Sequence, residues 1–314
     1  MLYKKILVTG GTGLVGHSFK KIQNNYPNRE FIFSSSKDCN LVKSSETINY
    51  VKKLNPDAII HLAAISGGIE FSMKKPATML RDNVIMNINI LEAARVCNIK
   101  KVVMTLSSGM YSSDVPKPIK EEYIHDGTPH GSNYSYAFAK RLVDPLVRSY
   151  RTEYNMNVIG LIPNGILGEN SNYRYDESTM VPALIRRFYE NKDKNNKITI
   201  WGDGSPLREI TFAEDMARAY MWCLDNYDDE QILHIGTTEE HSVKDIAYMI
   251  AEIIGVDKNR IDFDTAKPSG QPRKNTDNSK FIKISNFEYT PFKITLEKTI
   301  KWFCDNYKRD NIRL

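Results

Sequence analysis

The sequence predicts an α/β fold, a parallel sheet with helices on both faces and a smaller C-terminal lobe. Two observations predict it. Short β-branched runs alternate with longer segments whose apolar residues recur every three or four positions, as in strands followed by crossover helices. A glycine-rich turn follows the first such run. The length of 314 residues suits one two-lobed unit or two small domains.

Six segments have the composition of strands: 5–10, 31–35, 58–64, 101–108, 157–163 and 231–236. Two segments between them, 83–98 and 136–155, have the apolar periodicity of helices. Pro145 should bend or locally disturb the second helix, because proline lacks the N–H group that a helix interior requires.

Composition and charge exclude several classes of protein. With 41% hydrophobic and 26% charged residues, the chain has ordinary globular composition and no apolar run near the length of a membrane helix. Its net charge of +5 comes from 43 basic and 38 acidic residues spread along the chain. This charge is too diffuse to indicate nucleic acid, so we expect neither a nucleic-acid nor a membrane partner.

The N-terminal segment and the cysteines indicate the cellular compartment. A strand pattern begins within a few residues of Met1 and leaves no room for a signal peptide, so we expect a cytoplasmic protein. The cysteines have neither metal-ligand nor disulfide-scaffold spacing, and we expect buried reduced thiols and no metal. They are Cys39, Cys97, Cys223 and Cys304.

The segment "VTGGTGLVG" places Gly10, Gly13 and Gly16 between a strand and an apolar helix. Glycines at this spacing allow a tight turn in which a pyrophosphate lies against backbone N–H groups at the helix N-terminus. The alternative is a glycine-rich turn that binds nothing. The combination of strand, spacing and helix favours a dinucleotide site and therefore a Rossmann-type fold.

The end of the second strand decides which dinucleotide is expected. It is occupied by hydroxyl groups and a cation, Ser34, Ser35, Ser36 and Lys37, where an NAD-binding protein commonly has an acid. These groups suit a 2′-phosphate and favour NADP. Asp38 lies close enough in sequence to contact a ribose hydroxyl, so NAD stays an alternative.

The expected contacts of NADPH extend from the glycine loop to the sheet edge. They are Gly10, Thr12, Gly13, Leu14, Val15, Gly16, Ser35, Ser36, Lys37, Asn40, Leu41, Ala63, Ala64, Lys140 and Pro163.

The alternation of strands and helices weakens after residue 165, where polar loops occur at 168–179 and 266–277. Long ordered loops usually carry function. We therefore divide the chain into an NADP-binding domain, residues 1–165, and a mainly substrate-binding lobe, residues 166–314. The chain is expected to return to the first domain around 205–236, so the two parts are interleaved.

Tyr136 and Lys140 share one face of the predicted helix, a turn apart. A cation about 4 Å from a phenol contributes roughly 4 kcal/mol at an effective dielectric of about 20, enough to lower its pKa by about three units. Ser107, at the end of the fourth predicted strand, would hydrogen-bond the same substrate oxygen. Alone, the Tyr–Lys pair also fits a solvated helix face, but with the glycine loop and the serine it predicts carbonyl reduction.

Along nearly its whole length the sequence resembles the extended short-chain dehydrogenase/reductase family, and especially its GDP-L-fucose synthase-like members. The resemblance is carried by "AAISGGI" (63–69), "SSGMYS" (107–112), "YSYAFAK" (134–140), "MVPALIRRF" (180–188), "WGDGSPLRE" (201–209) and "KPSGQPRK" (267–274). It implies that Ser107, Tyr136 and Lys140 are catalytic.

The resemblance also implies a substrate site for a GDP-linked 4-keto sugar, in which Arg187, Arg208 and Lys274 hold the GDP. Trp201 lies near the base in this hypothesis, or alternatively is a core residue at a strand end. The expected substrate-binding residues are Ser108, Gly109, Thr179, Met180, Arg187, Trp201, Arg208 and Lys274.

Two departures from the family pattern concern epimerisation. GDP-L-fucose synthase-like enzymes epimerise carbons 3 and 5 with a cysteine two residues after the serine and a histidine before the "VIPALL" segment. The corresponding residues here, Gly109 and Thr179, do not titrate near neutral pH. His130, Tyr173 or Tyr175 are the alternatives that would replace them. The segment "PNGILG" (163–168) also departs from the usual P-x-N-x-Y-G.

We therefore expect an NADPH-dependent 4-ketoreductase that acts without epimerisation on a GDP-linked 6-deoxyhexose or heptose, in capsule or surface-polysaccharide synthesis. A homodimer, formed by the helix containing Tyr136 and the one before it, is implied by the resemblance. The alternatives are a bifunctional epimerase-reductase, a sugar-nucleotide dehydratase and a non-catalytic NADP-sensing protein. Gly109 and Met110 argue against the dehydratase, which needs an acid just after the serine.

Overall fold

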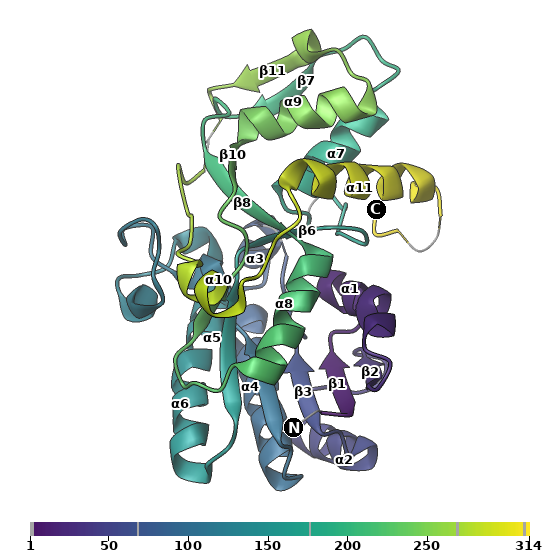
Figure 1. Cartoon of the computed structure of the whole chain (residues 1–314). Helices are drawn as coiled ribbons and strands as arrows, with labels where there is room; N and C mark the ends of the chain where they lie inside the picture. The colour runs from purple at the N-terminus through teal and green to yellow at the C-terminus, as the bar shows by residue number, and fades with distance from the viewer. Residues whose placement is uncertain (1–2, 68, 176, 268–269, 310–311) are drawn as a thin grey trace.

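The computed structural model describes residues 3–67, 69–175, 177–267, 270–309 and 312–314 (Figure 1). Four of the sequence segments above include positions outside these ranges. Segment 63–69 contains Gly68, segment 168–179 contains Asp176, and segments 266–277 and 267–274 both contain Pro268 and Ser269.

The main sheet is six-stranded and parallel throughout, in the order β2-β1-β3-β4-β5-β9. All the predicted strands contribute to it, which confirms the predicted fold class. The strands are β1 (Lys5–Thr9), β2 (Glu30–Ser34), β3 (Ala58–His61), β4 (Lys101–Thr105), β5 (Val158–Pro163) and β9 (Leu233–Ile235).

Several strands end earlier than their apolar runs predict, because the chain turns away from the sheet where the ligand would bind. Gly10 has a φ of 69°, which ends β1. After β4, Ser107 caps a short 3₁₀ turn by accepting a hydrogen bond from the Gly109 N–H at 3.2 Å. Ser107 therefore lies just beyond the strand rather than within it.

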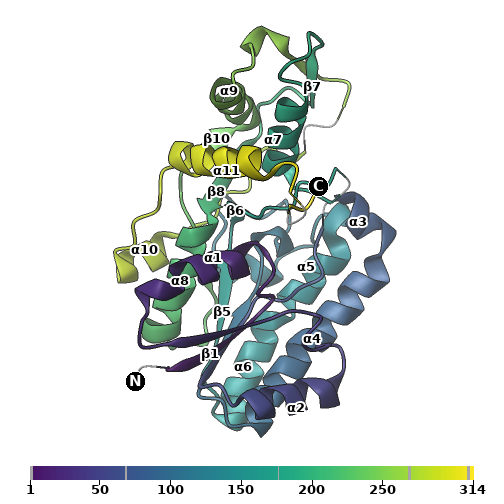
Figure 2. The same cartoon turned by 90° about the vertical axis from the view of Figure 1, so that its right-hand side faces the viewer.

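Helices cover both faces of the sheet (Figures 1 and 2). One apolar cluster joins the sheet to residues of α1 and α8, and another joins the opposite face to α2, α4 and α6. The bounds are α1 (Leu14–Ile22), α2 (Ser44–Leu54), α3 (Ile69–Lys74), α4 (Pro76–Val96), α5 (Tyr134–Arg141), α6 (Val143–Tyr154), α8 (Ala213–Asn226) and α10 (Ser279–Ser285). α4 begins earlier than expected because Pro76 is favourable in the first turn of a helix.

The predicted helix 136–155 is divided into α5 and α6 at Leu142. Pro145 has no N–H to donate to the carbonyl of Arg141, four residues earlier, so the helical hydrogen-bond ladder is interrupted there. The expected disturbance at Pro145 is confirmed. The interruption separates α5, which carries Tyr136 and Lys140, from the longer packing helix α6.

A smaller group of elements lies above the C-terminal edge of the sheet, around a third apolar cluster (Figure 1). β10, β8 and β6 form a three-stranded sheet, and β11 pairs with β7. The elements are β6 (Gly165–Leu167), α7 (Met180–Glu190), β7 (Ile198–Trp201), β8 (Leu207–Phe212), β10 (Glu240–Ser242), α9 (Val243–Ile254), β11 (Ile261–Asp264) and α11 (Phe292–Asn306). Short 3₁₀ helices occur at Gln23–Asn25, Ser108–Met110, Glu121–His125, Gly131–Asn133 and Lys258–Arg260.

The cysteines are free thiols, but only Cys39 and Cys223 are buried. Cys97 and Cys304 are partly exposed, contrary to the expectation. Cys97 is the C-cap of α4, and Cys304 lies in the last turn of α11. In the described ranges, we find no helix with the length and apolarity needed to cross a bilayer, and no group of His, Cys, Asp or Glu suited to a metal ion.

Candidate active site

A cavity of about 2150 Å³ lies along the C-terminal edge of the sheet. Its lining extends from Gly10 past Ser107 and Tyr136 to Arg208, so that it joins the glycine loop to the smaller lobe. This is where open α/β folds bind their ligands. The volume is large enough for two nucleotide-sized ligands to meet in one continuous space.

The three glycines form a cradle that side chains would fill. A Cβ atom on Gly10 would lie 2.8 Å from the Ala63 nitrogen, and one on Gly16 would lie 2.6 Å from the Gly10 oxygen. The Gly13 N–H donates to the Gly10 carbonyl at 2.9 Å, and Gly13 occupies the N-cap of α1. The close approach of backbone to backbone fits the pyrophosphate of a dinucleotide.

The end of the cavity that was expected to hold the adenosine is lined by Ser34, Ser35 and Ser36. The Asp38 carboxylate accepts hydrogen bonds from the Ser35 N–H at 2.8 Å and the Ser35 hydroxyl at 2.7 Å, which hold its pKa below the usual range. Asp38 is therefore turned toward its own loop and does not line the cavity. This arrangement favours hydroxyl groups over an acid as the ribose contacts.

Nearly all the predicted cofactor contacts line this cavity. Lys37 is the exception. Its side chain is exposed and is not among the residues that line the cavity. The predicted contacts that line the cavity are Gly10, Thr12, Gly13, Leu14, Val15, Gly16, Ser35, Ser36, Asn40, Leu41, Ala63, Ala64, Lys140 and Pro163.

Ser107, Tyr136 and Lys140 meet at the centre of the cavity. Tyr136 and Lys140 lie one turn apart on α5, with the Lys140 Nζ atom 5.7 Å from the centroid of the Tyr136 ring. Ser107 comes from the turn just after β4, and its side chain acts on the Tyr136 phenol by lowering the pKa. The Lys140 Nζ donates to the Thr105 carbonyl at 2.8 Å, so the ammonium is fixed beneath the phenol.

The pKa of Tyr136 differs from the sequence-based expectation. Burial raises it to about 12, and the neighbouring Ser107 side chain only partly offsets this effect. Burial also lowers the pKa of Lys140 to about 8. The expected lowering by Lys140 is wrong, because burial disfavours both charged forms and the ammonium is directed at the Thr105 carbonyl. A phenol that stays protonated at neutral pH is a proton donor.

Beneath this group, buried hydroxyl groups fix the ends of the strands. The Thr105 hydroxyl donates to the His61 carbonyl at 2.7 Å, and the Tyr220 hydroxyl donates to Thr105 Oγ1 at 2.9 Å. Burial, followed by the nearby Lys140 charge, lowers the pKa of His61 to about 3 and keeps its imidazole neutral. The sequence analysis did not identify these residues, because their roles depend on contacts between separate strands and helices.

Gly109 and Thr179 both line the cavity, as do Ser108 and Met180. A Cβ atom on Gly109 would lie 3.4 Å from the Ser107 Oγ atom and 3.1 Å from Asn133 Nδ2. The position therefore adjoins Ser107, and it carries no titratable group. Asn133 donates to the Gly109 carbonyl at 3.2 Å and is a further lining residue that the sequence did not indicate.

The proposed substitutes for the missing epimerase pair are in different environments. His130 and Tyr175 line the cavity, and the Tyr175 hydroxyl donates to Glu190. Tyr173 is fully buried and packs 4.5 Å from the Phe303 ring, measured between centroids. The suggestion of Tyr173 is wrong, because its aromatic ring is part of the core of the smaller lobe.

The expected nucleotide contacts line the distal part of the cavity. Arg187 donates to the Thr199 carbonyl at 2.7 Å, and Arg208 donates to the Gln271 carbonyl at 2.9 Å. Lys274 contacts solvent there, and the surrounding protein and then the Arg208 charge lower the pKa of its ammonium. Trp201 is 63% exposed at the end of β7, which excludes a core role.

Glu209 is a buried carboxyl group in the cavity wall that sequence reasoning overlooked. It accepts hydrogen bonds from the Thr276 N–H at 3.0 Å and from Asn164 at 3.3 Å. Burial raises its pKa from 4.5 to about 7, despite these donors. Glu209 therefore connects β8 with the end of β5 and with the segment after 270.

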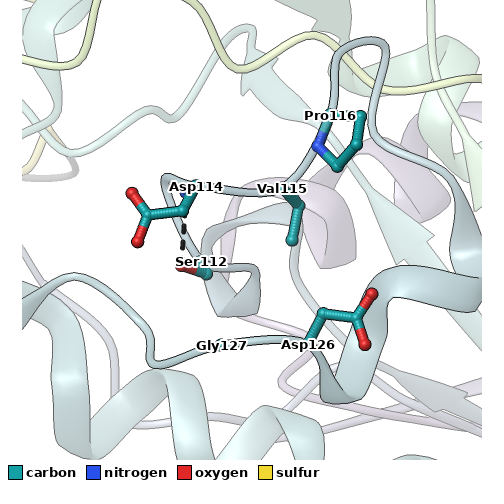
Figure 3. A pocket seen from close by; sticks show the side chains of 6 residues that line it. All are labelled: Ser112, Asp114, Val115, Pro116, Asp126 and Gly127. Carbon is teal, nitrogen blue, oxygen red and sulfur yellow. Dashed lines mark hydrogen bonds between the residues drawn. The ribbon is translucent and has the colours of Figure 1, made fainter.

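A second, smaller pocket of about 250 Å³ opens beside the cavity (Figure 3). Its lining includes Asp114 and Asp126, and Ser112 borders both spaces. The Asp114 N–H donates to the Ser112 hydroxyl at 3.2 Å, as Figure 3 shows. None of the Ser107, Tyr136 and Lys140 side chains reaches this pocket.

Together, the doubly wound sheet, the glycine cradle and the Ser–Tyr–Lys group define an extended short-chain dehydrogenase/reductase. The chain belongs to the NAD dependent epimerase/dehydratase family, whose model matches residues 6–236. It is GDP-L-fucose synthase-like within that family.

Comparison with known proteins gives the degree of similarity. The chain is 36% identical to a GDP-L-fucose synthase of Dictyostelium discoideum, over 97% of both chains. A GDP-L-fucose synthetase of Naegleria fowleri bound to NADP is 32% identical, with a TM-score of 0.93 over 99% of this chain and 95% of the other. A GDP-6-OMe-4-keto-L-xylo-heptose reductase from C. jejuni has a TM-score of 0.90 at 22% identity, over 98% of this chain and 99% of the other, and therefore shows the fold alone.

Proposed function

We propose that this protein is an NADPH-dependent oxidoreductase that reduces the C4 ketone of a GDP-linked 4-keto sugar without epimerising its neighbouring carbons. The observation that carries the proposal is the Ser107–Tyr136–Lys140 group beside Gly109 in one cavity. The group needed for proton donation is complete, whereas Gly109 and Thr179 offer no group that titrates near neutral pH.

Binding of both ligands is supported by charge and shape. The glycine cradle and the serines after β2 fit NADPH, and an NADP-bound relative of 32% identity supports this cofactor. Arg187, Arg208 and Lys274 would hold the diphosphate and base of the substrate, because guanidinium and ammonium groups pair with phosphate. The 36% identical relative named GDP-L-fucose synthase supports a GDP-sugar.

The residues of this chain would act on the ketone oxygen. Bound NADPH would supply the hydride. The Ser107 hydroxyl and the Tyr136 phenol would hydrogen-bond the oxygen and hold the carbonyl in position. Tyr136 would then give its proton to the developing alkoxide, and the Lys140 ammonium would stabilise the phenolate that this transfer leaves.

Exchange of hydrogen with solvent separates this proposal from the bifunctional epimerase-reductase. The protein is incubated with a GDP-4-keto sugar in deuterated water without NADPH, and the sugar is analysed by NMR. We expect deuterium at C3 and C5 no higher than in a sample without enzyme. Enzyme-dependent labelling would overturn the proposal and point to His130 or another cavity residue as the base.

The Gly109→Cys/Thr179→His double variant provides the positive control for this experiment. The position of Gly109 adjoins the Ser107 hydroxyl and meets only a side-chain nitrogen of Asn133 at 3.1 Å, so a thiol fits with a small adjustment. We expect the double variant to introduce deuterium that the unmodified protein does not.

Reduction itself distinguishes an enzyme from a non-catalytic NADP-sensing protein. A panel of GDP-4-keto 6-deoxyhexoses and heptoses is supplied with NADPH, and the products are identified by NMR. We expect reduced sugars, and their structures identify the preferred substrate. NADPH binding without turnover of any member would favour the sensing protein.

The wider role follows from the proposed substrate class. A reduced GDP-sugar would serve capsule or surface-polysaccharide synthesis in the cytoplasm.

We also propose a homodimer through α4 and α5, because large apolar side chains are exposed there, including Ile88 at 37% and Tyr134 at 49%. Sedimentation of the wild type and of Ile88→Glu tests this, with a monomeric wild type as the contrary result.

A further inference from the structure

The last residues of the described chain fold back onto the cavity. The Arg313 carbonyl accepts a hydrogen bond from the Tyr173 N–H at 2.9 Å, and Ile312 packs against the apolar cluster of the smaller lobe. Arg313 itself is half-buried and lines the cavity. The main chain of the tail is thus fixed beside the cavity.

In the part of the chain that the structure describes, Arg313 forms no ion pair, and Glu177 acts on its charge only from a longer distance. Its guanidinium donates to the Asn170 carbonyl, a neutral acceptor, and no carboxylate lies within ion-pair distance of it. Arg174, which also lines the cavity, is paired with Glu177 at 3.2 Å. Burial, followed by the Arg174 charge, lowers the pKa of Arg313. A half-buried cation without a counter-ion is unfavourable unless a ligand supplies one.

The loop that holds Arg313 runs along α1, from Leu14 in its first turn to Lys21 in its last. A Cβ atom on Gly168 would be 3.6 Å from Leu14 Cδ1, and Glu169 forms an ion pair with Lys21 at 2.8 Å. Leu14 directly follows Gly13 at the helix N-cap, and both residues line the cavity. Arg313 therefore reaches the cavity from the loop beside the glycine cradle.

Arg208 and Lys274 reach the same cavity from β8 and from the segment after residue 270. These elements belong to the group that carries the proposed GDP contacts. The two sets of cations thus enter from different elements, which suits two diphosphate groups, one from each ligand.

We infer that Arg313 is a ligand-binding residue that contacts the pyrophosphate of the dinucleotide across from the glycine loop, with Arg174 adding a second positive charge. This inference rests on the proposed function, which supplies the dinucleotide. It assigns to the C-terminal tail a direct part in closing the cofactor site. Arginine suits this role because its planar guanidinium pairs with two phosphate oxygens at once.

The test measures binding of each ligand separately. NADPH and GDP are titrated into the full-length protein and its Arg313→Gln variant, with fluorescence for NADPH and calorimetry for GDP. We expect the Kd for NADPH to rise about tenfold in the variant, the loss typical of a charge-assisted contact, while the Kd for GDP changes less than about twofold. Arg313→Lys should be intermediate, because it keeps the charge but loses the paired geometry.

Arg309→Gln is the matched control, since Arg309 is exposed and does not line the cavity. It should bind both ligands as the wild type does. An unchanged Kd for NADPH in Arg313→Gln, or a loss confined to GDP, would overturn the inference and leave the proposed function intact. A lower melting temperature without ligand together with equal losses for both ligands would also overturn it, because this result describes a structural anchor. A wild type that does not bind NADPH would instead overturn the proposed function.

Discussion

At the residue scale, the chemistry depends on how burial changes the protonation of two side chains. The pKa of Tyr136 is raised to about 12 and that of Lys140 lowered to about 8, both mainly by burial. The spacing of the two residues was visible in the sequence. The direction in which the pKa of Tyr136 shifts was not visible there. It depends on the surrounding protein and on the Thr105 carbonyl, which holds the Lys140 ammonium.

Tyr136→Phe should remove the proton donor and keep the ring that lies beside Lys140. We expect kcat to fall by about 10²-fold or more, the usual contribution of a general acid, with the Kd for NADPH within about twofold of the wild type. The decrease in NADPH absorbance measures turnover. Tyr134→Phe is the matched control, because Tyr134 is on the same helix and 49% exposed. Equal activity of Tyr136→Phe and wild type would contradict the catalytic role.

The rate should also depend on the charge of Lys140. Its pKa of about 8 means that the ammonium loses its proton as the pH rises through that value. Because the ammonium would stabilise the phenolate of Tyr136 in the proposed reaction, kcat/KM of the free enzyme should fall above pH 8. A pH profile measures this, and Lys140→Met should be slow without the same decline. An identical alkaline decline in Lys140→Met would assign it to another group.

At the element scale, the first strand, the glycine turn and α1 form one unit whose geometry is set by close backbone contacts. The positive φ of Gly10 turns the chain out of β1, and Gly16 brings α1 against that turn. The spacing of the glycines indicated this unit directly. The division of the predicted helix 136–155 into α5 and α6 at Leu142 was also predictable from Pro145. The early ends of β3 and β4 could not be predicted from the sequence, because their apolar runs continue into residues that line the cavity.

Gly16→Ala should displace α1 from the glycine turn. Its Cβ atom would be 2.6 Å from the Gly10 oxygen and the Gly11 Cα atom, too close for either backbone atom to remain in place. We expect the Kd for NADPH to rise at least about tenfold and the melting temperature to fall. Gly131→Ala serves as the control, because a Cβ atom there would meet nothing within 4 Å. NADPH binding that is equal in both variants would contradict the role of Gly16.

At the scale of the whole molecule, the two groups of elements are connected by buried polar contacts around Glu209 and Asn164. Asn164 at the end of β5 accepts a hydrogen bond from Thr211 at 2.6 Å and donates to the Thr237 carbonyl at 2.9 Å. Glu209 accepts from Thr276 on the returning segment. The division of the chain into an NADP-binding domain and a substrate-binding lobe stays a prediction, and this network is where the two would be held together.

Glu209 should make stability depend on pH. Its pKa is raised from 4.5 to about 7, so its favourable contribution is complete below pH 4.5 and is lost as the pH rises through 7. We expect Glu209→Gln to match the wild type near pH 4 and to gain on it by pH 8, by roughly 3 kcal/mol at most. Urea unfolding at each pH measures this difference. Glu288→Gln, at an exposed position, should show no such gain. Parallel curves for Glu209→Gln and wild type would contradict the expectation.

The sequence by itself determined the order of strands and helices, the glycine turn, the Tyr–Lys spacing and the absence of a cysteine and a histidine at positions 109 and 179. These features depend on local periodicity and on residues a few positions apart, which a sequence displays directly. Only the tertiary structure decided that Tyr173 is in a core, that Trp201 is exposed, and that Glu209 and Arg313 face the ligand cavity. Burial and charge at those positions come from segments far apart in the chain, and neither is encoded in any short stretch of it.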